Sequence, residues 1–392
     1  MRWKLVASGL ALIAATYGLA RFGYGLFLPR FAEAFDMGPG LSGAIQAGSF
    51  LSYCVTALLA ARLGSRPRLV IVLAGATAAL GAAGVAAAPN AEVLAAAVVL
   101  AGAGAGFATP GLVTLIESNV ESRRQENAQT IVNSGTGAGL VAAGSLLILV
   151  GSHWRLGWAA IAAVVILATG ATLRSDRKKK PAAPAPAPGR KELVLLGRPL
   201  VAAGLAGASS AAVWTFGRTV LAEGRETELY SIGAWMVLGA FGVLGAGAGR
   251  IVQAWSLRTA WTVTTLPMAG ATMLMGAFPG TAAAAYAAAA LFGASYIAMS
   301  GVLIVWASGL CRSRPPPERL PSLLRSPWAR PPDQSALGPC SRRMRRWEPS
   351  ASPPPSGFLP SSPPGSVDAP LPNIRTTPSP FHRDDRNCPI PR

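Results

Sequence analysis

The stretch RSDRKKKPAAPAPAPGRKELVLLGR, residues 174–198, decides how the chain is read, because it separates two sets of apolar segments. It opens with a group of five cations, after which alanine and proline alternate. Alternating Ala and Pro favour an extended polyproline II conformation over a packed core. Lys and Arg concentrate in the cytoplasmic loops of membrane proteins. We therefore interpret residues 174–198 as a cytoplasmic linker between two halves.

The composition of the whole chain is typical of a membrane protein. Of 392 residues, 51% are hydrophobic and 13% are charged, and the mean hydropathy is +0.40. A soluble chain of this length is less apolar. The net charge is +18, yet the cations lie between apolar runs and are not interleaved with aromatic residues on one helix face. We therefore expect a lipid bilayer around the protein and no nucleic-acid partner.

Ten apolar runs are long enough to cross a bilayer, which takes about 20 residues. The first follows Arg2 and Lys4, as the apolar run of a signal peptide would, but it continues to Leu28, so we expect an uncleaved helix. The predicted fold class is therefore an all-α membrane protein. The ten runs cover about residues 5–29, 41–63, 68–88, 91–116, 128–150, 154–173, 199–221, 229–248, 259–278 and 282–309.

The cations predict which way the spans are oriented. If the N-terminus is cytoplasmic, the loops on its side hold seventeen Lys and Arg residues, whereas the opposite loops hold only Arg30, Arg155 and Arg225. Positive charge collects on the cytoplasmic side of membrane proteins. We therefore expect the N-terminus, the loop at 62–68 and the linker to be cytoplasmic.

An internal repeat relates the two sets of spans. LAGAGAGFATPGLVTLI (100–116) aligns with LFGASYIAMSGVLIVWA (291–307), which places Gly102 over Gly293. Arg21 of the first span corresponds in the same way to Arg218 of the seventh. Repeats six spans apart that are joined by a basic linker are typical of a 6+6 transporter, whose halves are related by an axis along the membrane normal. The many glycines of the spans predict close helix packing, and their spacing does not complete a dinucleotide-binding motif.

The loop LLAARLGSRPR (58–68) carries the most specific family signal. It resembles the G-x-x-x-D-R-x-G-R-R signature of the major facilitator superfamily, with Arg62, Gly64 and Arg66 in the expected places. The resemblance covers essentially residues 1–310. It implies two six-helix halves, transport by alternating access, and a gating role for this loop. Ala61 stands where the signature has its aspartate, which weakens the implied gating role but not the implied fold.

A finer resemblance rests on three segments. YGLARFGYGLFLPRF (17–31), AGSFLSYCVTALLAARL (47–63) and VWTFGRTVL (213–221) resemble the uncharacterised YbfB-like branch of bacterial carriers. This branch implies a bacterial cytoplasmic (inner) membrane and no known substrate.

The expected domain boundaries follow the linker and a change of composition near residue 310. The tail holds 21 of the 33 prolines, so it cannot form bilayer helices. We interpret the tail as the product of a shifted reading frame that replaces two further spans, with a natural disordered cytoplasmic tail as the alternative. The expected parts are a first half at 1–173, the linker at 174–198, a second half with four recognisable helices at 199–310, and the tail at 311–392.

Polar residues inside the predicted spans are the candidates for substrate binding. Arg21 and Arg218 are charges within apolar runs, and such charges are functional hypotheses by default, although Arg21 could also extend to the headgroups. Gln46, Ser49 and Tyr53 form a polar stripe at i, i+3 and i+7, which faces either a cavity or another helix. The predicted substrate-binding residues are Arg21, Tyr24, Gln46, Tyr53, Asn133, Trp214 and Arg218.

The residue types that enzymes and metal sites need are scarce in this chain. His153 and His382 are isolated, and no two cysteines have the spacing of a zinc site or a disulfide. We therefore expect no enzyme activity, cofactor or metal. The predicted function is secondary transport of a small molecule by a monomer, and two intramembrane arginines favour a small organic anion. The alternative is an inactive membrane protein that lacks the last two spans.

Overall fold

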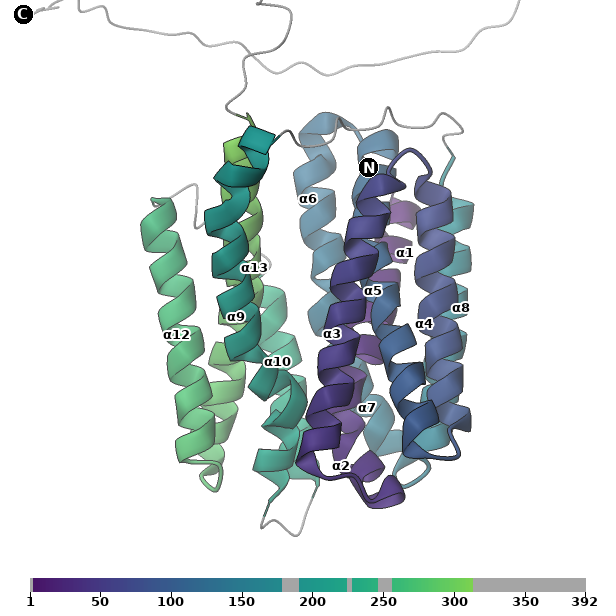
Figure 1. The fold of residues 1–392 in the computed structure, drawn as a ribbon, viewed down its shortest axis with the longest axis vertical. Helices are drawn as coiled ribbons and strands as arrows, with labels where there is room; N and C mark the ends of the chain where they lie inside the picture. The colour runs from purple at the N-terminus through teal and green to yellow at the C-terminus, as the bar shows by residue number, and fades with distance from the viewer. Residues whose placement is uncertain (1–2, 178–189, 224–227, 246–255, 313–392) are drawn as a thin grey trace, which may run out of the picture. The chain divides into compact units, whose positions relative to one another are not determined.

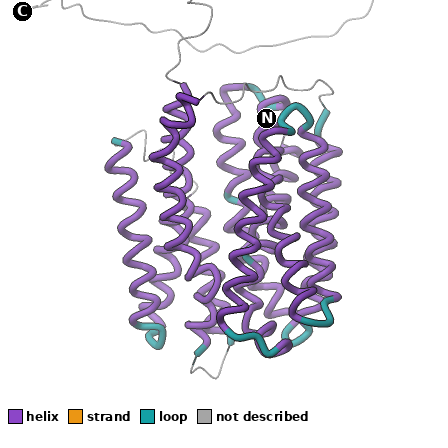
Figure 2. Tube along the Cα trace, in the orientation of Figure 1, coloured by secondary structure: helices purple, strands orange, loops and turns teal. Residues whose placement is uncertain are grey.

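The computed structural model describes residues 3–177, 190–223, 228–245 and 256–312. Within these ranges every regular element is a helix (Figures 1 and 2), and the described residues belong to one compact unit. The prediction of an all-α fold is confirmed. The elements are α1 (Trp3–Ile13), η1 (Ala14–Arg21), α2 (Gly23–Phe35), α3 (Pro39–Arg62), α4 (Pro67–Ala87), α5 (Ala91–Asn119), α6 (Ser122–Asn133), α7 (Gly135–Val150), α8 (Trp154–Ser175), α9 (Arg190–Ala222), α10 (Leu229–Gly245), α12 (Leu257–Ala277) and α13 (Ala282–Arg312).

The described helices group into ten rods that match the ten predicted spans. The segments α1, η1 and α2 form one rod, and α6 and α7 form another. Eight rods are long and apolar enough to cross a membrane. The helix α9 begins at Arg190, inside the stretch that we expected to be linker, and the tail at 313–392 lies outside the described residues.

Local sequence fixes several of the helix ends. Pro39 and Pro67 stand in the first turns of α3 and α4, where a missing backbone N–H leaves no hydrogen bond unmade. The Asn90 side chain accepts a hydrogen bond from the Val93 N–H and so caps α5. Asp36 ends α2 in the left-handed conformation, with φ at 49°. These short turns allow successive rods to run in opposite directions.

Contacts between distant segments identify the two ends of the rods. At one end, the Ser175 hydroxyl of α8 donates to the Lys4 carbonyl of α1 across 3.4 Å. At the other end, the Trp154 ring at the start of α8 packs on Phe31 and Phe35 of α2. The first rod and α8 therefore run antiparallel, as Figure 1 shows.

Glycine lets the rods approach closely, as the sequence predicts. A Cβ atom on Gly102 of α5 would collide with Ser49 of α3, and one on Gly293 of α13 would collide with the Leu238 carbonyl of α10. In each half the fourth rod therefore packs on the second through an aligned glycine, which agrees with the internal repeat. Between the halves, Gly137 of α7 packs in the same way on the backbone of α10.

Candidate functional site

A widened helical turn lies in the middle of the first rod. The segment η1 is a π-helix, and it ends where the Phe22 N–H donates to the Tyr17 carbonyl across 2.9 Å. A Cβ atom on Gly18 would collide with the backbone of Gly139 in α7. Wide turns of this kind are frequent at functional sites, and here the turn ends at Arg21.

The Arg21 guanidinium is enclosed by aromatic rings. The side chain is 9% exposed, and no hydrogen bond or ion pair joins it to another described residue. Its Nε is buried without a partner. We call this arginine and its four ring neighbours the Arg21 cluster. The distances from its Cζ to the ring centroids are 3.9 Å for Tyr53, 5.1 Å for Phe22, 5.2 Å for Phe50 and 5.6 Å for Tyr17.

Tyrosine hydroxyls join the cluster to three rods. The Tyr17 hydroxyl lies 3.2 Å from the Tyr53 hydroxyl of α3 and 2.8 Å from the Thr109 hydroxyl of α5. The hydroxyls of the two tyrosines are thus bonded to each other, and the Arg21 Cζ lies over the faces of both rings. A cation over an aromatic face is stabilised by about 0.5–2 kcal/mol, which offsets only part of the desolvation of a buried charge.

Two polar side chains of α3 are buried without partners. Gln46 is 1% exposed, and neither its amide oxygen nor its amide nitrogen has a hydrogen-bond partner. The buried Ser49 hydroxyl is unpartnered as well, and it lies against Gly102 of α5. Buried polar atoms are almost always bonded. Gln46 precedes Phe50 of the cluster by four residues, so the two side chains lie on the same face of α3.

Trp214 connects the Arg21 cluster to the second half. Its ring stacks on Phe22 at 4.0 Å and packs edgewise on Tyr296 at 5.0 Å. A Cβ atom on Gly25 would collide with the Trp214 carbonyl, so the backbones of α2 and α9 approach each other closely at this level. Trp214 therefore contacts both halves.

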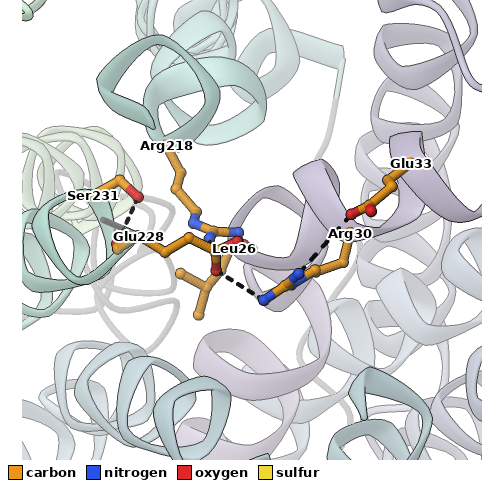
Figure 3. A network of polar contacts seen from close by, with 6 residues as sticks. All are labelled: Leu26, Arg30, Glu33, Arg218, Glu228 and Ser231. Atoms are coloured by element: carbon orange, nitrogen blue, oxygen red, sulfur yellow. Dashed lines mark hydrogen bonds and ion pairs between the residues drawn. The ribbon is translucent and has the colours of Figure 1, made fainter. Parts of the chain in front are cut away.

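Arg218 has polar partners among the described residues, unlike Arg21. Its Nη1 donates to the Leu26 carbonyl across 2.6 Å, and its Nη2 donates to Glu228 Oε2 across 3.0 Å. Arg30 Nη2 donates to the same oxygen across 3.1 Å (Figure 3). We call Arg30, Arg218 and Glu228 the Glu228 network. The carboxylate of Glu228 lies in the turn before α10. A search for charges inside the spans alone therefore does not find it.

The remaining predicted residues lie outside the Arg21 cluster. Tyr24 is fully buried, donates to the Ser42 carbonyl and stacks on Phe31, so it packs within the first half. Asn133 is half-buried at the end of α6, and none of the ring contacts of the cluster involves it. Of the predicted residues, the structure thus brings Arg21 and Tyr53 into contact, and it packs Trp214 on Phe22 of the cluster.

The loop between α3 and α4 is tied to the end of α8. Arg62 ends α3, and the Arg66 N–H donates to the Leu63 carbonyl within a turn that contains Gly64. Two residues further on, Arg68 Nε forms an ion pair with Asp176 Oδ2 at 3.0 Å. Asn119 of α5 donates to the other oxygen of this carboxylate at 2.8 Å. Asp176 was not among the predicted site residues because it lies in the predicted linker. A single acid among the cations that directly follow a span is nevertheless a signal that could have been used.

Comparisons with solved structures identify the architecture. The chain is similar to a bacterial homologue of the human lysosomal transporter Spinster, inward-facing and unoccupied, with 16% identity, TM-score 0.60, and 79% and 78% of the two chains covered. It is also similar to the nucleoside transporter NupG, with 11% identity, TM-score 0.58, and 79% and 86% of the two chains covered. A D-xylose-proton symporter is similar as well, with 12% identity, TM-score 0.53, and 79% and 89% of the two chains covered. At these identities the likeness shows the fold alone.

The family itself is shown by sequence. A search of curated proteins finds none that matches the chain. The family model described as Major Facilitator Superfamily matches residues 10–322, which is well over half of the chain and includes every described helix except the first turns of α1. Because that match spans both sets of helices, the chain belongs to the Major Facilitator Superfamily.

Proposed function

We propose that the protein carries a small organic anion across the membrane and that Arg21 is the residue that binds it. The family and the solved transporters support a secondary transporter rather than an enzyme. The single observation that supports an anion is the buried Arg21 guanidinium, which has no anionic or hydrogen-bonding partner among the described residues.

The energetics of Arg21 favour a ligand of opposite charge. Moving a cation out of water is strongly unfavourable unless a partner compensates it. The rings of the Arg21 cluster compensate part of this energy, but no hydrogen bond joins the guanidinium to their hydroxyl groups. A carboxylate can accept two parallel hydrogen bonds from a guanidinium. The unpartnered amide of Gln46 adds a donor and an acceptor for the uncharged part of the ligand.

Alternating access requires the contacts between the halves to break and re-form. On the described residues, these contacts include the Phe22–Trp214 stack and the Glu228 network. Both join the first rod to the second half on the side of Arg21 that leads toward Phe35. We propose that this side is the outer gate, which closes over the bound anion, and that Arg62, Gly64 and Arg66 lie at the inner side of the first half.

Other parts of the proposal rest on the sequence alone. The cation distribution supports a cytoplasmic N-terminus, and the resemblance to the YbfB-like branch supports a bacterial inner membrane. We propose that the carrier works as a monomer. The reading-frame interpretation of residues 311–392 supports the alternative proposal, a membrane protein that folds but does not transport.

The test is binding and transport by the full chain in proteoliposomes. A panel of small carboxylates, neutral sugars and cationic amines is screened by thermal shift, and the compounds that stabilise the protein are tested for uptake. We expect carboxylates to bind and Arg21→Lys to weaken binding at least tenfold, because an ammonium group loses the planar two-point contact. Arg155→Lys is the matched control, because the Arg155 guanidinium also stacks on an aromatic ring, with its Cζ 4.2 Å from the Trp154 ring centroid. Arg155 lies at an outer helix end.

The outcomes separate the candidates. If only neutral or cationic compounds stabilise the protein, and Arg21→Ala keeps full binding and transport of them, then Arg21 is structural and the anion proposal is wrong. A folded protein that binds carboxylates through Arg21 but never carries them would support the non-transporting alternative.

A further inference from the structure

The second half carries an open apolar groove that is unrelated to the Arg21 cluster. It has a volume of about 820 Å³ and lies between α9, α12 and α13. A volume of this size is within the range of roughly 300–1,000 Å³ that small-molecule sites occupy. Its walls are formed mainly by Val201, Ala202, Leu205, Ala206, Met268 and Ala269.

The groove exists because one face of α9 is uncovered by described residues. In the apolar segment of the first rod 78% of the residues are buried, but in that of α9 only 33% are buried. The first rod is covered by α8, where the Thr172 hydroxyl donates to the Ser8 carbonyl. Among the described helices, none takes the place of α8 beside α9 and α12, and Leu205 is 69% exposed.

The polar atoms along the walls are already satisfied. The Ser209 hydroxyl donates to the Ala206 carbonyl across 3.0 Å, and the Thr265 hydroxyl donates to the Trp261 carbonyl across 2.8 Å. The depth of the groove therefore presents hydrocarbon and needs no polar ligand. An acyl chain meets this requirement.

One end of the groove has a different character. Arg198, Trp261 and Trp306 gather there, and the two indole rings pack edgewise with centroids 6.2 Å apart. Arg198 is exposed, and it precedes Arg218 by twenty residues, or about 30 Å along a helix. It therefore lies at the opposite end of α9 from the Glu228 network, the end at which most of the loop cations of the sequence are found.

We infer that this groove binds an anionic phospholipid, with its acyl chains along α9 and α12 and its phosphate at Arg198. Tryptophan rings occupy the level of the membrane interface, just below the headgroups. Basic pockets between spans at the cytoplasmic surface bind anionic headgroups. An apolar helix from another protein would fill the walls as well, but it would bring no counter-charge to Arg198. The charge at the rim therefore selects the lipid over a helix.

The test compares two lipids that differ only in the headgroup. The purified full chain is stripped of lipid in mild detergent and titrated with phosphatidylglycerol or phosphatidylcholine of identical acyl chains, and the bound lipid is counted by native mass spectrometry. We expect one site that prefers phosphatidylglycerol at least fivefold. Arg198→Gln should abolish this preference while leaving the weaker binding of phosphatidylcholine, and Ala202→Trp, which fills the groove, should abolish both.

Two matched controls accompany these variants. Arg123→Gln removes an exposed cation from α6 in the first half, and Ala203→Trp adds the same ring to the exposed face of α9 next to the groove. Both should bind lipid as the parent does. An unchanged headgroup preference in Arg198→Gln would overturn the inference. So would a dimer, or a complex with a second membrane protein, that excludes the lipid and is lost in Ala202→Trp.

Discussion

Asp176 Oδ2 lies 3.0 Å from Arg68 Nε, and this ion pair gives the loop between α3 and α4 a carboxylate that its own sequence lacks. The family signature places an aspartate at the position of Ala61, whereas the chain supplies one from the end of α8. The Asp176 side chain is 2% exposed and also binds Asn119. Three helix ends therefore meet at one carboxylate, at the point where the linker leaves the first half.

The first prediction concerns this carboxylate. Asp176→Asn should lower the free energy of unfolding by about 1–2 kcal/mol, less than for a fully buried pair because Arg68 is 56% exposed. The nitrogen of the new amide would also face either the Arg68 guanidinium or the Asn119 side-chain nitrogen, and both of these are donors. Thermal unfolding in detergent measures the effect. Glu121→Gln is the control, since its pair with Arg124 is exposed and 3.8 Å long; equal melting temperatures for both variants would contradict the prediction.

The second prediction concerns the Glu228 network. Glu228→Gln leaves the fully buried Arg218 side chain without a counter-ion, so it should destabilise the protein by about 2–3 kcal/mol. It should also separate α2 from α9, which spin labels on the two helices would report as a longer distance. Glu33→Gln, which removes only an exposed partner 3.9 Å from Arg30, is the control. The gate assignment fails if the label distance stays the same.

The third prediction concerns the close approach of η1 and α7. Gly18→Ala should destabilise the protein by about 1–3 kcal/mol, because its methyl group would overlap the backbone of Gly139. The same change at Gly204 meets no atom within 4 Å, so it should be neutral or stabilise α9 by up to about 1 kcal/mol. Melting temperatures of the two variants decide the matter, and a stable Gly18→Ala protein would show that the two rods can move apart easily.

The fourth prediction concerns orientation. In a background without the native cysteines, Ser152→Cys in the turn between α7 and α8 should react with an impermeant maleimide in intact cells. Ser65→Cys, in the turn between α3 and α4, should react only after the cells are permeabilised. These expectations follow from the excess of cations on the N-terminal side, and the opposite labelling pattern would reverse the topology.

The helices could be predicted from sequence because the bilayer imposes a length of about 20 apolar residues on each of them. The start of α9 could not, because Arg190, Lys191 and Glu192 extend the helix beyond any apolar run. The close helix packing was also predictable, because glycines that recur within a span, such as Gly102, mark positions where another helix lies too near for a side chain.

The candidate site was predictable only in part. Arg21 stands out because a charge inside an apolar run is visible in the sequence, and the stripe of Gln46 and Tyr53 follows from helical spacing. The partners of Arg218 could not be found in this way. Glu228 lies in a turn, and Arg30 belongs to the other half of the chain, so their meeting depends on tertiary structure that no local pattern records.

The π-helix before Arg21 has a consequence for the phase of everything that follows it. A wide turn takes in extra backbone, whereas each residue of a regular α-helix rotates the next side chain by about 100°. The turn therefore absorbs one extra residue while the helix on either side keeps its phase. A single-residue deletion between Ala14 and Arg21 that restored a regular helix should leave Arg30 facing Glu228, whereas the same deletion inside α2 ahead of Arg30 would turn it away. Length in the wide turn is thus under looser constraint than length in the regular helix that follows it.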